Sequence, residues 1–86
     1  MYVIIVYDTE QDNCARLHKF LKRYLHWNQR SVFEGSVTEA QLRKVRKTLE
    51  EIRADESHIV LYVMENEKLL QRQEMGQGGG IVSNIL

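Results

Sequence analysis

The fold is decided by one apolar stretch that ends in a carboxylate, MYVIIVYDTEQD at residues 1–12. Six strand-forming residues, Tyr2 to Tyr7, run directly into Asp8. A strand with one solvated face alternates between apolar and polar residues, whereas a strand covered on both faces does not. The stretch therefore predicts a central strand over residues 2–7.

Asp8 itself has two interpretations. An aspartate after a strand commonly starts a turn, because its carboxylate accepts a hydrogen bond from the backbone two residues further on. If a two-fold axis passes near this strand end, however, two copies of Asp8 approach each other, and like charges at that distance retain a proton or recruit a cation. Oxygen ligands without His or Cys favour Mg²⁺ or Mn²⁺. The residues alone leave both interpretations open.

Two amphipathic helices are predicted from apolar residues that recur every three or four positions. The first follows a cap at Asp12 or Asn13 and extends to about Leu25. The second begins at Thr38, where Thr38-Glu39-Ala40-Gln41 forms a capping box, and ends near Arg53.

The remaining segments favour β-structure. Residues 29–37 predict a strand that bends or pairs back on itself at Gly35, and residues 58–64 predict a further apolar strand. Residues 69–75 could be strand or helix. The run Gly76-Gln77-Gly78-Gly79-Gly80 predicts a flexible joint before a short β-prone segment, Ile81 to Leu86.

This order of elements indicates an α+β fold, a ferredoxin-like βαββαβ sandwich with additional C-terminal strands and two helices on one face of an antiparallel sheet. Residues 1–75 form the predicted domain, and residues 76–86 form a glycine hinge and a strand that adds to a partner protomer. The other sheet face, carrying residues such as Tyr2, Ile4 and Val6 or their alternating neighbours, is left uncovered. An uncovered apolar sheet predicts a homodimer packed sheet to sheet.

The composition is that of a small globular protein whose charges are unevenly distributed. The 86 residues carry no net charge, but residues 1–47 hold nine Lys and Arg against five Asp and Glu, and the rest hold three against seven. No apolar run is long enough to cross a membrane. The single cysteine, Cys14, excludes an internal disulfide and favours a reducing compartment, so we expect a cytoplasmic protein.

A basic stripe lies on the first predicted helix. Arg16, Lys19 and Arg23 are spaced at i, i+3 and i+7, and Arg30 follows on the next strand. Such a stripe can follow a phosphate backbone, or it can serve only solubility. A second cluster, residues 43–47, has Glu39, Glu50 and Glu51 at ion-pair spacing and is predicted to be a solvated face.

Three stretches together resemble a known family: VIIVYD at residues 3–8, QRSVFEGSVTEAQL at 29–42 and HIVLYVM at 58–64. They are similar to the small CRISPR-associated protein Cas-two, the partner of the Cas-one integrase. The resemblance implies a homodimer that acquires CRISPR spacers, bridges the integrase and holds duplex DNA. It also implies Mg²⁺-dependent cleavage of RNA or DNA, with one Mg²⁺ or Mn²⁺ between the two copies of Asp8 and with Tyr7, Ser31 and Phe33 as further catalytic residues.

Two other functions remain open at this stage. A stand-alone toxin-like endoribonuclease of the VapD type resembles the same fold and would act without an integrase. A small-ligand or RNA-binding module is also compatible with the fold, but residues 58–64 offer Tyr62 as their only aromatic ring for stacking on RNA bases.

Overall fold

The first strand lies inside the sheet, as its sequence predicts. The computed structural model describes residues 1–76, in which β1 (Tyr2–Asp8) pairs antiparallel with β3 (Val32–Ser36) on one side and with β4 (His58–Met64) on the other. The four-stranded sheet has the order β2-β3-β1-β4, with β2 formed by His26–Gln29.

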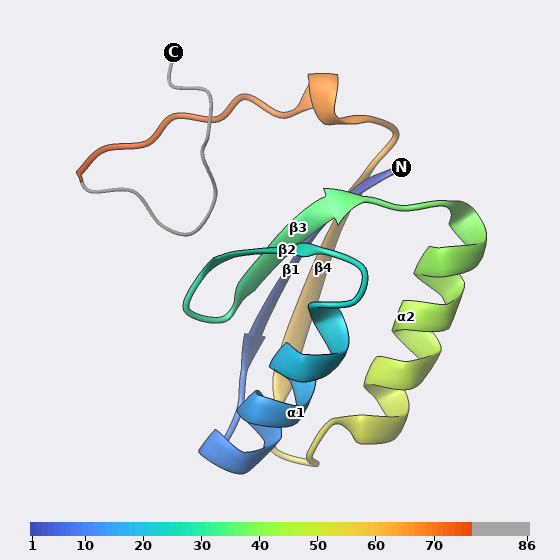
Figure 1. Cartoon of the computed structure of the whole chain (residues 1–86), viewed down its shortest axis with the longest axis vertical. Coiled ribbons are helices and arrows are strands. Elements are labelled where there is room, and N and C mark those ends of the chain that lie inside the picture. Colours follow the sequence, from blue (N-terminus) through green and yellow to red (C-terminus); the bar gives the residue numbers. More distant parts are fainter. Residues whose placement is uncertain (77–86) are drawn as a thin grey trace.

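Both helices cover the same face of this sheet (Figure 1). Helix α1 spans Gln11–Leu21 between β1 and β2, and helix α2 spans Glu39–Ile52 between β3 and β4. The element order is therefore β1-α1-β2-β3-α2-β4, followed by one turn of 3₁₀-helix, η1, at Glu67–Leu69. This confirms the predicted ferredoxin-like α+β fold.

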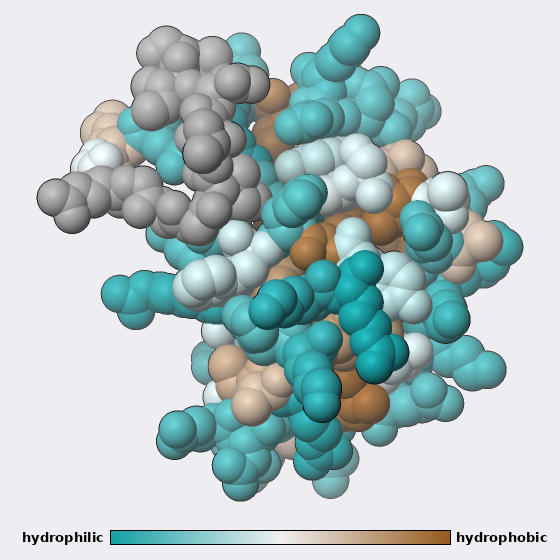
Figure 2. Space-filling model, viewed as in Figure 1, coloured by the Kyte–Doolittle hydropathy of each residue, from teal (hydrophilic) through white to brown (hydrophobic). Residues whose placement is uncertain are grey.

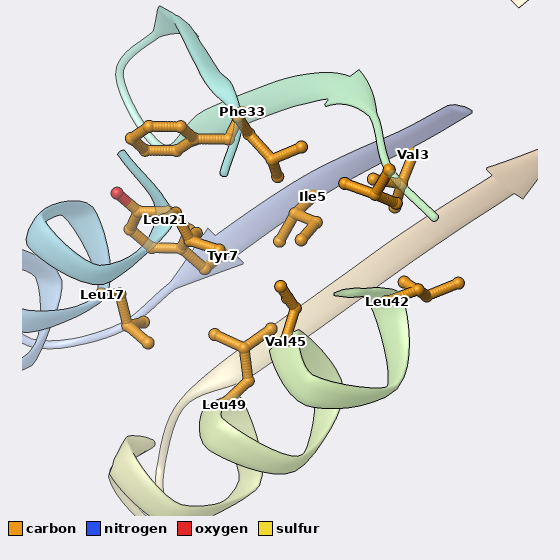
Figure 3. Packing of buried hydrophobic residues seen from close by; sticks show 11 residues of the cluster. Val3, Ile5, Tyr7, Leu17, Leu21, Phe33, Leu42, Val45 and Leu49 are labelled. Atoms are coloured by element: carbon orange, nitrogen blue, oxygen red, sulfur yellow. The ribbon is translucent and has the colours of Figure 1, made fainter. Parts of the chain in front are cut away.

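The core lies between the sheet and the helices. Val3, Ile5 and Tyr7 alternate along β1 toward the helices and are buried there. Figure 3 shows them converging with Phe33 of β3 and with leucine and valine side chains of α1 and α2. Hydrophilic side chains cover the outer faces of the helices, and hydrophobic side chains occupy the strip between them (Figure 2). The period of two along β1 thus selects which half of its apolar residues forms the core.

The ends of α1 differ from the prediction. Its N-cap is Glu10, whose side chain forms no capping bond, so Asp12 and Asn13 do not cap it. Asn13 is instead buried: with its amide oriented to satisfy both groups, it donates to the Ile52 carbonyl and accepts from the Ala54 N–H, each at 2.9 Å. The helix ends at Leu21 rather than at Leu25, although Leu25 remains in the core.

The start of α2 agrees with the sequence. The Gln41 N–H donates to Thr38 Oγ1 at 3.0 Å, and the Thr38 N–H donates to Gln41 Oε1 at 2.9 Å. The predicted capping box is therefore formed, and the helix ends at Ile52, next to the predicted end.

The predicted bend at Gly35 is wrong. The chain reverses between β2 and β3 at Arg30, whose φ of 44° lies in the left-handed region that few non-glycine residues adopt. Gly35 lies inside β3, where a Cβ atom would come within 3.2 Å of Leu25 Cδ2. Gly35 thus allows the core residue Leu25 to approach the strand, and it does not turn the chain.

From residue 65 to residue 76, the chain after β4 is neither strand nor helix beyond the single turn η1. Of the predicted glycine joint, Gly76 has a positive φ of 87°. The rest of the joint and the predicted strand Ile81–Leu86 lie outside the described residues.

The face of the sheet opposite the helices carries a strip of apolar side chains. Ile4 lies across from Tyr62, and Val6 lies across from Val60. Ile4, Val6 and Val60 are half-buried and Tyr62 is 55% exposed, so the strip stays accessible among the described residues. Tyr2 is an exception on this face, because it is 6% exposed.

We predict that Asn13→Ala lowers the free energy of unfolding by about 2 kcal/mol, because it leaves the Ile52 carbonyl and the Ala54 N–H without their buried partner. Thr38→Ala, which removes an exposed cap, should cost about 1 kcal/mol. Urea denaturation at one fixed protein concentration measures both. A smaller loss for Asn13→Ala than for Thr38→Ala would contradict the assigned bonds.

Candidate metal and nucleic-acid sites

Asp8 is the last residue of β1 and pairs across the sheet with His58 of β4. Its carboxylate is exposed and accepts no hydrogen bond from residues 1–76, so the side-chain hydrogen bond of the turn interpretation is not formed. A groove of about 460 Å³ opens beside it, lined by further carboxylates at Glu10, Asp55 and Glu56. The chain thus gathers negative charge at this end of the sheet.

Residues 1–76 of one copy do not supply a metal site by themselves. No group of three or more His, Cys, Asp or Glu residues converges within the described part of the chain. Asp8 offers one carboxylate on an exposed surface, and a hard cation such as Mg²⁺ requires several oxygen ligands. A metal at Asp8 therefore needs ligands beyond those that residues 1–76 of one copy bring together.

Tyr7 points to the opposite side of the strand, into the core. Its side chain is 3% exposed, and its hydroxyl has no hydrogen-bond partner among the described residues. Burial and, to a smaller extent, the neighbouring Cys14 side chain together raise the pKa of Tyr7 to about 12. At neutral pH Tyr7 is consequently a neutral phenol held by packing.

Ser31 and Phe33 lie on the same side of the sheet as Tyr7. The Tyr7 N–H donates to the Ser31 carbonyl at 3.1 Å, and Ser31 Oγ lies 3.8 Å from Cys14 Sγ. Phe33 is fully buried, with its ring centroid 6.4 Å from that of Tyr7 and 5.0 Å from that of His18. The structure therefore brings Tyr7, Ser31 and Phe33 together behind β1, while Asp8 stands apart on the solvent side.

The predicted basic residues are all exposed, but only two of them belong to a helix. Arg16 and Lys19 lie on α1, Arg23 lies in the turn after it, and Arg30 forms the turn between β2 and β3. None of the four forms an ion pair with another residue of the region 1–76. The ring centroids of His18 on α1 and Trp27 on β2 lie 5.5 Å apart in an edge-to-face arrangement. This contact holds the β2–β3 hairpin beside the helix.

Glu34 is a structural residue whose role was not predicted from the sequence. It is 3% exposed on the sheet face opposite the helices, where it accepts a hydrogen bond from the Tyr2 hydroxyl at 3.0 Å and forms an ion pair with Arg72. Arg72 also lies 3.8 Å from Glu74. These contacts hold the segment after β4 across Tyr2. The sequence did offer a signal for this role: Glu34 is a carboxylate in the middle of a predicted strand, and a buried charge requires a partner.

These features define a small ferredoxin-like protein with an uncovered sheet face, an acidic strand end and an exposed basic helix. The family model that matches is CRISPR associated protein Cas2, over residues 1–72. The chain belongs to the Cas2 family.

Relatives and solved structures agree with this assignment. The chain is 37% identical to a protein of Methanosarcina acetivorans named CRISPR-associated endoribonuclease Cas2, with all of both chains covered. It is 39% identical to CRISPR-associated endoribonuclease Cas2 2 of Archaeoglobus fulgidus, over 94% of this chain and 89% of that protein. A crystal structure titled as Cas2 superposes with a TM-score of 0.87 at 35% identity, over 100% and 98% of the two chains. The Streptococcus pyogenes Cas2 structure shares the fold, with a TM-score of 0.77 at 24% identity over 88% and 100%.

None of the helices described within residues 1–76 is long and apolar enough to cross a bilayer.

We predict that Tyr7→Phe unfolds with equal or greater free energy at pH 7, because the lost hydroxyl has no hydrogen-bond partner. The wild-type pKa is higher in the folded state, about 12, than its ordinary value of 10.0. The fold favours the neutral form of Tyr7, so the stability that this side chain contributes is complete below pH 10. That stability is lost as the pH rises toward 12. Tyr7→Phe should weaken that alkaline loss in denaturant titrations at several pH values.

Tyr62→Phe is the matched control, since it removes a hydroxyl from an exposed side chain. A loss of more than about 1 kcal/mol for Tyr7→Phe at pH 7 would show that the hydroxyl has a bonding partner.

Proposed function

We propose that this protein is a spacer-acquisition subunit that dimerises through its open sheet face, bridges the Cas-one integrase and holds duplex DNA without sequence preference. The proposal of DNA binding rests on a set of exposed cations on α1 and the adjoining turns: Arg16, Lys19, Arg23 and Arg30. None of them forms an ion pair with a described residue. Membership of the CRISPR-associated Cas2 family supports a role in spacer acquisition. It favours this function over that of a stand-alone toxin of the VapD type.

The apolar strip on the open face supports the proposed dimer. Ile4, Val6, Val60 and Tyr62 present a contiguous surface that a second copy would remove from water. Since Asp8 lies at the end of the same strand and on the same face as Ile4 and Val6, two sheets that meet there bring their Asp8 residues to one side of the interface. A small domain with a limited core also gains stability from such an interface.

For DNA binding, we predict that Arg16→Ala/Lys19→Ala/Arg23→Ala lowers duplex affinity and reduces the slope of log affinity against log salt by about 2 to 3. Each lost phosphate contact removes about 0.9 from that slope. Fluorescence anisotropy with two labelled duplexes of unrelated sequence measures both quantities, and the loss should be the same for each duplex.

The matched control is Arg43→Ala/Lys44→Ala/Lys47→Ala, which removes equal charge from α2. An equal fall in slope for the control would show that net charge, and not the α1 surface, sets the affinity.

A second candidate function is metal-dependent cleavage of RNA, which the names of the relatives support. The Asp8 carboxylates of two copies would hold one Mg²⁺ or Mn²⁺, which when bound polarises a phosphoryl oxygen or lowers the pKa of a bound water. In this function Asp8 is the group that contacts the cation. Tyr7, Ser31 and Phe33 fix the end of β1 from behind, because they lie on its helix-covered side.

We predict that Asp8→Asn abolishes Mg²⁺-dependent cleavage of a labelled RNA while leaving the sedimentation coefficient of the dimer unchanged, since the amide removes the anionic ligand and little else. Glu10→Gln is the matched control, because it neutralises a carboxylate in the same groove that the proposal does not use as a ligand. Cleavage that persists in Asp8→Asn would assign the activity to another site or to a contaminant.

A further inference from the structure

Trp27 presents an exposed aromatic ring that the sites described above do not use. It belongs to β2, the outermost strand on one side of the described sheet, and its side chain is 45% exposed. Trp27 pairs across the ladder with Phe33, so both side chains stand on the face that the helices cover. The ring therefore lies at the outer margin of the core, next to α1.

Two contacts hold the indole ring in place. Its Nε1–H donates to the Arg30 carbonyl at 2.8 Å, across the turn between β2 and β3. Its ring packs edge to face with His18, whose own ring centroid lies 5.0 Å from that of Phe33. The single polar group of the indole is thus satisfied within the protein, and what the ring exposes to water is its apolar surface.

Packing accounts for only part of the Trp27 side chain. The ring covers His18, but a smaller apolar side chain such as leucine would also cover it and would leave less apolar surface in water. The neighbours of Trp27 on β2, His26 and Asn28, are polar, so the ring is not part of a larger apolar patch of the kind that protein partners use. It is a single flat aromatic surface, which suits stacking on another planar ring.

Three exposed cations lie close to Trp27 in the chain. Lys22 and Arg23 directly follow α1, and Arg30 directly follows β2. None of them forms an ion pair with another residue of the region 1–76. Lys22 lies one helical turn after His18, on the side of α1 that meets the indole. An aromatic ring among cations is the arrangement that binds single-stranded nucleic acids, because bases stack on the ring while phosphates meet the cations.

The second cationic cluster of the described structure lacks such a ring. Arg43, Arg46 and Lys47 of α2 are exposed and line a groove of about 750 Å³ between α2 and β4, and no Phe, Tyr or Trp side chain lines that groove. The ion pairs that the sequence spacing suggested for this cluster are not formed within residues 1–76. Charge alone does not distinguish the two cationic surfaces, whereas the indole does.

We propose that Trp27 is a stacking platform for an unpaired nucleobase of a nucleic acid bound to the α1 surface. The base stacks on the exposed part of the indole, and the phosphates beside it pair with Lys22 and Arg30. The unpaired base belongs to a free single strand or to a single-stranded end of a duplex, since bases inside a duplex are already stacked on one another. The inference deepens the nucleic-acid binding proposed above and rests on it.

Trp27 is the only tryptophan of the chain, so its fluorescence reports stacking directly. We expect an oligothymidylate to quench this fluorescence, and an abasic oligomer with the same number of phosphates to bind without quenching it. A duplex with a thymidine tail should quench it, and the matching blunt duplex should not. The affinities of the free oligothymidylate and the tailed duplex then show which source of unpaired bases is preferred.

Substitutions at Trp27 separate stacking from packing. Trp27→Leu keeps an apolar cover on His18 but removes the aromatic face, and it should lower the affinity for a labelled oligothymidylate about tenfold in fluorescence anisotropy. Trp27→Phe keeps an aromatic face and should retain most of the affinity. Both variants, once thermal unfolding has shown that they are folded, should bind the abasic oligomer as the wild type does.

The proposal is overturned if Trp27→Leu binds the oligothymidylate as tightly as the wild type, or if it loses affinity for the abasic oligomer to the same extent. It is also overturned if no nucleic acid quenches Trp27, or if the blunt duplex quenches as strongly as the tailed one. The DNA-binding proposal fails differently, through an unchanged salt slope for Arg16→Ala/Lys19→Ala/Arg23→Ala, so the two failures are distinguishable.

Discussion

The structure depends on the fact that β1 is apolar on both faces while the helices cover only one of them. Val3, Ile5 and Tyr7 leave water against α1 and α2, and each such side chain contributes about 2 kcal/mol to folding. Ile4 and Val6, with the same chemistry, are left on the other side. Because the side chains of a strand alternate with a period of two, the packing of Tyr7 in the core also places Asp8 on the solvent side. The alternation of side chains along β1 therefore decides both which residues form the core and which side of the sheet Asp8 occupies.

The chain itself covers part of the open face, and it does so with charge rather than with apolar groups. Glu34 is buried in the middle of β3, and such a carboxylate is stable only with a partner that replaces its hydration. Arg72 and the Tyr2 hydroxyl provide that replacement, so the segment after β4 is tied to the sheet at this point. Ile4, Val6 and Tyr62 keep accessible surface, which leaves an apolar strip bordered by a buried ion pair.

The absence of net charge conceals two separate cationic surfaces. One surrounds α1 and the β2–β3 turn, and the other lines the groove between α2 and β4. Four carboxylates gather elsewhere, at the end of β1, where Asp8, Glu10, Asp55 and Glu56 line one groove. A charged partner responds to the local field and not to the sum of the charges. A single small domain can therefore present separate acidic and basic surfaces although its net charge is zero.

The sequence by itself determined the features that depend on neighbouring residues. The unbroken apolar run predicted β1 as a central strand that ends near Asp8. The capping box predicted the start of α2 at Thr38. The spacing of the basic residues predicted that Arg16 and Lys19 lie on the first helix. The motifs around Asp8 and Phe33 were sufficient to recognise the family. Local hydrogen bonds and periodicity carry this information, so no knowledge of distant contacts is needed.

Only the tertiary structure decided where distant residues meet. The role of Asn13 depends on Ile52 and Ala54, the burial of Glu34 depends on Arg72, and the place of Gly35 inside β3 depends on Leu25. The chain reverses at Arg30, where local preference favours glycine or asparagine, because the pairing of β2 with β3 requires the turn there. The groove beside β4 likewise exists only once α2 has packed against the sheet. The roles of Asn13 and Glu34 and the groove beside β4 are set by contacts between residues far apart in the chain, and no local pattern encodes such a contact.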